Sequence, residues 1–138
     1  MTKGNNLVVL VGHLGADPEE RYTANQNRVV QLRVATNYFK KDSQGERSEH
    51  TDWHQVDVWG NTGHFCARYL QKGDKVQVLG SIRNRVVEKD GNRRTFTSVT
   101  AWEVNVLNPI SSRTPRALSK SDYGPQGSHR PIADGLPF

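Results

Sequence analysis

The chain has 138 residues and a formal net charge of +5, a length that fits one domain with an appendage. Its single cysteine, Cys66, excludes an intramolecular disulfide and a zinc site built on cysteines, so the cytoplasm is the expected compartment. No apolar run reaches the roughly 20 residues of a membrane span, so no membrane partner is expected. The basic balance admits nucleic acid or an anionic surface as a partner and does not choose between them.

The first half of the chain consists of short apolar or alternating segments between turn signals. Residues 7–14 form an apolar run that Gly15-Ala16-Asp17-Pro18 closes. Residues 29–38 and 51–59 alternate between apolar and polar side chains, and a polar hairpin loop over residues 40–47 separates them. Alternation puts successive side chains on opposite faces, so each segment is predicted to be a strand with one face in the core.

The second half is expected to hold the only clear helix and two further strands. Residues 61–71 have apolar side chains at helical spacing, and Lys72-Gly73-Asp74 ends the helix with the glycine near the C-cap. Strands are predicted over residues 75–87 and 95–107, joined by a hairpin turn at 89–92. The prediction is therefore an all-β fold: a five-stranded OB-fold barrel with one short helix between strands 3 and 4, a fold that binds oligonucleotides or oligosaccharides.

The composition changes near residue 108. Five of the six prolines lie in residues 109–138, a stretch with little apolar periodicity. Such a segment buries too little apolar surface to offset the entropy of ordering it. Residues 1–107 are therefore assigned to the OB-fold domain, and residues 108–138 to a disordered tail.

Two tryptophans share a polar face in the strand over residues 51–59. Val56 and Val58 point to the core side, so Trp53 and Trp59 lie on the opposite face with a glutamine and an aspartate. One interpretation is that these rings pack under a loop or against a subunit. The other is a stacking platform, on which each base contributes about 1–3 kcal/mol with little sequence preference.

Neighbouring strands favour the platform because they bring cations and a further aromatic to the same sheet face. Basic residues beside aromatic rings suit a flexible phosphate chain with exposed bases. The residues predicted to bind such a single-stranded nucleic acid are Trp53, Trp59, Phe39, Arg33, Arg83, Arg85, Lys89, Arg93 and Arg94.

Constellations for catalysis or metal binding are poor. His50 and His54 are four apart on a strand without a third ligand, and Asp52 and Asp57 point to opposite strand faces. Gly12-His13-Leu14-Gly15 is not a phosphate loop, since no Gly-Lys-Ser/Thr follows. We expect no enzyme activity, no catalytic residue, no metal site and no cofactor.

Six motifs occur in a characteristic order and spacing. They are residues 6–19 (NLVVLVGHLGADPE), 21–23 (RYT), 51–54 (TDWH), 58–60 (VWG), 69–74 (YLQKGD) and the terminal 136–138 (LPF). In these motifs the sequence resembles bacterial single-stranded DNA-binding proteins over nearly its whole length.

The resemblance implies a homotetramer of OB domains that wraps single-stranded DNA without sequence choice, in replication, repair and recombination at the nucleoid. It implies base stacking at Trp53 and Trp59, with a third ring at or near Phe39. Val87 stands where the family often has an aromatic on the second hairpin.

The end of the tail is the second region to which the resemblance gives a role. It implies that the C-terminal tip docks replication and repair proteins, here through Asp134, Leu136, Pro137 and Phe138. The family tip is usually acidic, whereas this tip carries one aspartate, which predicts weaker attraction by charge.

A second functional class stays open: an OB-fold adaptor of a replication restart complex, since the fold alone does not separate the two. The two tryptophans on a polar face favour DNA binding over the adaptor.

Overall fold

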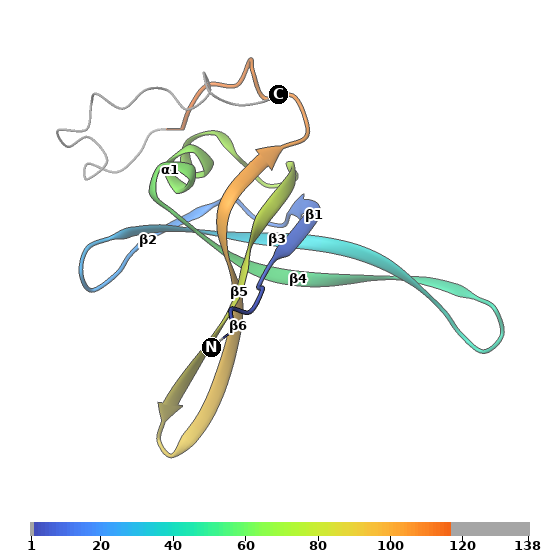
Figure 1. Cartoon of the computed structure of the whole chain (residues 1–138). Coiled ribbons are helices and arrows are strands. Elements are labelled where there is room, and N and C mark those ends of the chain that lie inside the picture. Colours follow the sequence, from blue (N-terminus) through green and yellow to red (C-terminus); the bar gives the residue numbers. More distant parts are fainter. Residues whose placement is uncertain (1, 117–138) are drawn as a thin grey trace.

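The computed structural model describes residues 2–116, and residues 1 and 117–138 lie outside the described part. Six strands and one helix follow one another within the described residues (Figure 1). They are β1 (Val8–Leu14), β2 (Glu19–Tyr22), β3 (Arg28–Lys41), β4 (Arg47–Trp59), α1 (Gly60–Tyr69), β5 (Lys75–Lys89) and β6 (Asn92–Val106).

Five of the strands close into a barrel. The sheet runs β1-β5-β6-β4-β3, and a pairing of β1 with β3 at His13↔Ala35 and Leu14↔Val34 joins its two edges. The predicted all-β, five-stranded OB-fold barrel with a helix between the third and fourth barrel strands is confirmed. The short strand β2, which pairs with β3, was not predicted, because its sequence Glu-Glu-Arg-Tyr has no apolar alternation.

The register of the strands builds the core that the alternation predicts. Val30 of β3 pairs with Val58 of β4, and Leu32 pairs with Val56, and all four side chains are fully buried. On β6 the register shifts at Trp102, because Glu103 faces Leu79 while Ala101 faces Gly80. This bulge keeps apolar residues of β6 on the core side both before and after it.

Two hairpins extend beyond the barrel as arms (Figure 1). We call residues 37–51 the β3–β4 arm and residues 83–98 the β5–β6 arm. Their strands are longer than predicted, because polar strands pair through their backbones without a core. The β5–β6 arm turns at Asp90 and Gly91, whose φ angles of 55° and 79° fit the two-residue turn that its Asp-Gly dipeptide favours.

Helix α1 lies across one end of the barrel and begins directly after Trp59 (Figure 1). The helix ends at Tyr69, and the C-cap residue Leu70 is extended and buried in the core. Gly73, which the sequence placed near the C-cap, therefore belongs to the turn that follows. Burial raises the pKa of the Cys66 thiol in this helix to about 12, so the thiol is uncharged at neutral pH. No helix within residues 2–116 is long and apolar enough to cross a membrane.

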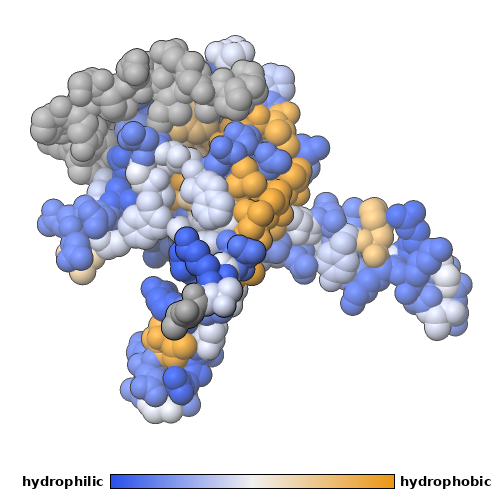
Figure 2. Space-filling view, viewed as in Figure 1, coloured by the Kyte–Doolittle hydropathy of each residue, from blue (hydrophilic) through white to orange (hydrophobic). Residues whose placement is uncertain are grey.

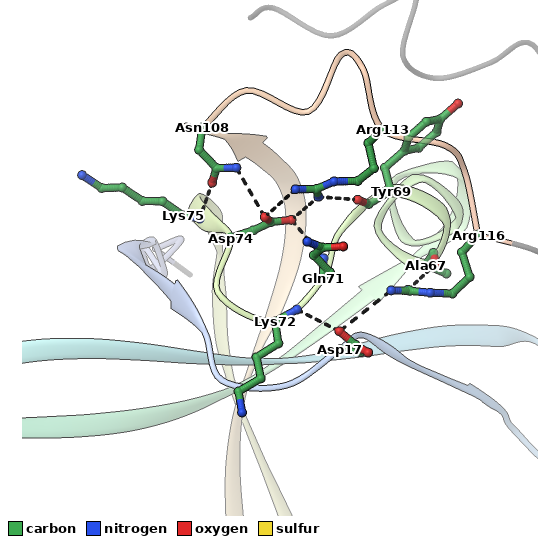
Figure 3. Close-up of polar contacts among 10 residues, drawn as sticks. All are labelled: Asp17, Ala67, Tyr69, Gln71, Lys72, Asp74, Lys75, Asn108, Arg113 and Arg116. Atoms are coloured by element: carbon green, nitrogen blue, oxygen red, sulfur yellow. Dashed lines mark hydrogen bonds and ion pairs between the residues drawn. The ribbon is translucent and has the colours of Figure 1, made fainter.

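Residues 108–116 pack on the domain, although the sequence assigned them to the tail. Ile110 is buried in the core, and Arg113 donates hydrogen bonds to both carboxylate oxygens of Asp74 at 2.6 and 3.1 Å. Arg113 also donates to the carbonyl of Tyr69 at 2.7 Å (Figure 3). We call residues 108–116 the strap. Proline content could not reveal these contacts, which join residues far apart in sequence. The rest of the expected tail lies outside the described residues.

Candidate nucleic-acid interface

The two tryptophans of β4 lie on the outward face of the barrel, as the alternation predicts. Trp53 and Trp59 are 53% and 42% exposed, whereas Val56 and Val58 between them are fully buried. The two tryptophans are six positions apart along the strand, a separation of about 20 Å. Both rings therefore have surface free for a ligand, and the core beneath them does not depend on them.

Arg33 lies beside the Trp53 ring. Its guanidinium carbon is 5.4 Å from the ring centroid, and its strand β3 pairs with β4 so that Arg33 faces Gln55. A guanidinium at this distance is within reach of a cation–π contact. The same group can contact a phosphate when a base stacks on the ring.

A second aromatic–arginine pair lies on the β3–β4 arm. Phe39 is exposed, and the guanidinium carbon of Arg47 is 4.4 Å from its ring centroid. Phe39 pairs with Glu49, four positions from Trp53 along β4, which places the ring about 13 Å further out. Phe39 is among the residues that the sequence predicted to bind, whereas Arg47 is not.

A third pair lies on the β5–β6 arm and was not predicted. Phe96 is exposed, pairs across the strands with Arg85, and has the guanidinium carbon of Arg85 5.9 Å from its ring centroid. Val87 leaves β5 without an aromatic on this arm, but Phe96 supplies one from the neighbouring strand. The signal was available, since a ring opposite Arg85 follows from pairing the two strands across the Asp-Gly turn.

The remaining predicted cations divide between the two faces of the β5–β6 arm. Arg83 and Lys89 share the face of Arg85 by alternation, and Arg94 joins them opposite Val87. Arg93 instead faces Glu88 on the other side of the arm. The structure thus brings Arg83, Arg85, Lys89 and Arg94 together with Phe96 and leaves Arg93 apart.

The histidines that the sequence considered as ligands have other partners. The His50 ring stacks on Tyr38 with centroids 5.4 Å apart, and His54 lies 2.8 Å from the Thr36 hydroxyl. Within residues 2–116, no group of three or more His, Cys, Asp and Glu side chains could hold a metal ion. The exposed rings beside cations are an arrangement that suits the binding of a single-stranded nucleic acid.

A separate apolar surface lies on β1 and on the residue before it. Leu7, Val9 and Val11 are 65%, 52% and 46% exposed, and Val9 pairs with Leu79 of β5. Figure 2 shows an apolar surface on this side of the barrel, while both arms are mostly hydrophilic. An apolar surface of this kind commonly marks a protein–protein contact.

The comparisons with known proteins agree with this geometry. Residues 5–107 match the model of the single-strand binding protein family. Single-stranded DNA-binding protein 1 of Chlorobaculum tepidum is 38% identical over 81% of this chain and 70% of its own length. The single-stranded DNA-binding protein of Xylella fastidiosa is 34% identical over 94% of this chain and 86% of its own. The Plasmodium falciparum protein solved with single-stranded DNA superposes with a TM-score of 0.72 at 26% identity, covering 78% of this chain and 99% of that one.

Proposed function

Because the chain belongs to the single-strand binding protein family, we propose that it binds single-stranded DNA without sequence choice. Its role is to cover and protect that DNA during replication, repair and recombination, in the cytoplasm at the nucleoid. The observation that supports this most is the outward face, where three exposed rings each have an arginine 4.4–5.9 Å away. Every base has a face that stacks, so such a surface needs no particular sequence.

In this proposal the rings hold bases and the cations hold phosphates. Bases stack on Trp53, Trp59, Phe39 and Phe96, and the strand continues from the barrel onto both arms. Each arginine gives up only a weak contact of about 0.5–1 kcal/mol with its exposed ring when it moves to a phosphate. An adaptor that bound only proteins would have no use for this repeated pairing.

Binding is expected to weaken as salt is added. Five cations share the outward face, Arg33, Arg83, Arg85, Lys89 and Arg94, and each phosphate neutralised on a single strand contributes a slope of about −0.7 in log affinity against log salt. When Arg83, Arg85 and Arg94 are all changed to alanine, the slope should therefore become less negative by about 2. The measurement is the affinity for poly(dT) at several salt concentrations.

Arg93→Ala is the matched control for the salt titration. It removes one positive charge from the same arm, but from the face opposite the rings. Its slope should stay close to that of the unchanged protein. A flat salt dependence of the unchanged protein, or an equal effect of Arg93→Ala per charge removed, would contradict the assignment of this face to phosphates.

We also propose that the chain forms a homo-oligomer, a tetramer with D2 symmetry. The exposed apolar side of β1 supports this, since burying Val9 and Val11 between subunits removes apolar surface from water. Light scattering at micromolar concentration should give four times the 15.5 kDa chain mass. Changing Val9 and Val11 to aspartate should lower that mass, and a monomeric unchanged protein would rule the tetramer out.

The C-terminal tip is proposed to recruit replication and repair proteins through Asp134, Leu136, Pro137 and Phe138, residues outside the described part of the chain. The ring of Phe138 and the charge of Asp134 are groups that a partner surface with an apolar pocket and basic residues binds. Deleting Phe138 should abolish retention of such partners on an affinity matrix and leave poly(dT) affinity unchanged. Unchanged retention would defeat this role.

A further inference from the structure

A glycine lies against the ring of Trp53. Gly15 follows β1 directly, and its backbone N–H donates a hydrogen bond to the carbonyl of Arg33 at 2.9 Å. A Cβ atom built on Gly15 would overlap Cζ3 of Trp53, and would lie 2.6 Å from Cη2 and 3.2 Å from Cε3. These three consecutive atoms form the outer edge of the six-membered ring, so that edge occupies the space of the absent side chain.

The backbone of Gly15 does not itself require glycine. Its φ angle lies outside the positive range, unlike those of Gly60 and Gly73. The three heavy atoms nearest to the built Cβ all belong to Trp53. An alanine at this position would therefore act through the ring and not through the backbone conformation.

The Trp53 ring is thus held by groups from outside its own strand. Gly15 contacts its outer edge, the guanidinium carbon of Arg33 lies 5.4 Å from its centroid, and the Gly15–Arg33 hydrogen bond ties these two positions together. These contacts restrict the orientations open to a ring that is 53% exposed. A side chain that is already ordered loses less conformational freedom when a ligand binds.

We infer that Gly15 is a positioning residue for Trp53: its missing side chain lets the ring take the orientation in which a base stacks. This inference rests on the proposed function, because it gives Gly15 its effect on DNA only through Trp53. A side chain at position 15 displaces the ring edge, and the displaced ring presents a less favourable or less ordered surface to the base.

The test compares Gly15→Ala in two backgrounds, the unchanged protein and Trp53→Phe. Phenylalanine keeps a ring that stacks but lacks the outer edge that meets Gly15. We expect Gly15→Ala to weaken poly(dT) binding about three- to tenfold in the unchanged protein, as loss of one pre-ordered side chain would, and less than twofold in Trp53→Phe. Gly4→Ala is the matched control, since nothing lies within 4 Å of a Cβ atom there.

A second readout follows the ring without DNA. Gly15→Ala should change the near-ultraviolet circular dichroism of the tryptophans, and the change should be absent when Trp53 is already phenylalanine. Equal loss of affinity in both backgrounds, or no loss in either, would overturn the positioning role. Trp53→Ala separates this outcome from failure of the proposed function. If Trp53→Ala binds poly(dT) normally, the platform itself is wrong; if it binds weakly while Gly15→Ala binds normally, only the role of Gly15 falls.

Discussion

Replacing Trp53 and Trp59 together by alanine is expected to weaken binding to single-stranded DNA by about 2–6 kcal/mol, since each lost stack costs about 1–3 kcal/mol. This is the largest effect that we expect on affinity. Residual binding should remain, because the double variant keeps Phe39, Phe96 and the cations on the outward face. The affinity should be measured by anisotropy of a labelled oligo(dT), because the substitutions remove two of the three tryptophans.

The matched control is the third tryptophan. Trp102 is 57% exposed at the bulge of β6 and does not belong to the set of rings assigned to the interface. Trp102→Ala should leave the affinity near that of the unchanged protein. The double variant should still fold, because both rings point away from the buried valines of β4. A folded double variant with unchanged affinity would rule the stacking platform out.

Arg113→Ala is expected to lower the free energy of unfolding by about 2–3 kcal/mol. The substitution leaves the carboxylate of Asp74 buried without its cation, and removing one member of a buried ion pair commonly costs about 3–5 kcal/mol. The cost should lie at or below the lower end of this range, because Arg113 is partly exposed and Asp74 keeps two hydrogen bonds. These come from Asn108 and from the backbone N–H of Gln71. Urea denaturation at pH 7 measures the loss.

The same pair makes the stability depend on pH. Burial raises the pKa of Asp74, but hydrogen bonds from Arg113, Gln71 and Asn108 and the charge of Arg113 outweigh it, so the net pKa is lowered. A carboxyl with a lowered folded pKa stabilises the fold above its ordinary value near 3.8, and loses that contribution as pH falls through the folded pKa. The difference in stability between the unchanged protein and Arg113→Ala should therefore shrink below about pH 4.

Asp17→Asn provides the matched control for the Arg113–Asp74 ion pair. Asp17 lies 3.9 Å from Arg116 but is largely exposed, and an exposed ion pair contributes at most about 1 kcal/mol (Figure 3). Its substitution should change the unfolding free energy little at any pH. If Arg113→Ala were as stable as the unchanged protein at pH 7, the strap would not be part of the folded unit.

The barrel and the outward position of most residues of the candidate interface could be predicted because their signal is local. Alternation along single strands is enough to put Val56 and Val58 inside and Trp53 and Trp59 outside, and the Asp-Gly turn marks one hairpin. The same logic placed Phe39 and Arg85 on outward faces. Each of these predictions needs only the position of a strand and the alternation of its side chains between two faces.

The missed features depend on contacts between distant residues. Arg113 reaches Asp74 across 39 positions, and Gly15 touches a ring 38 positions away. Phe96 becomes informative only when its strand is paired with that of Arg85, and the same pairing sets Arg93 on the other face. Composition gave Ile110 to a tail, although the folded barrel buries that side chain.

The most direct test of the central claim is a titration of intrinsic tryptophan fluorescence with poly(dT) at low salt, run beside a titration with duplex DNA of the same length. Stacking on Trp53 and Trp59 should quench the emission strongly and to saturation with poly(dT), and the duplex should quench it far less at the same concentrations. Fluorescence that stays unchanged as poly(dT) is added, or that falls equally with duplex DNA, would contradict the account.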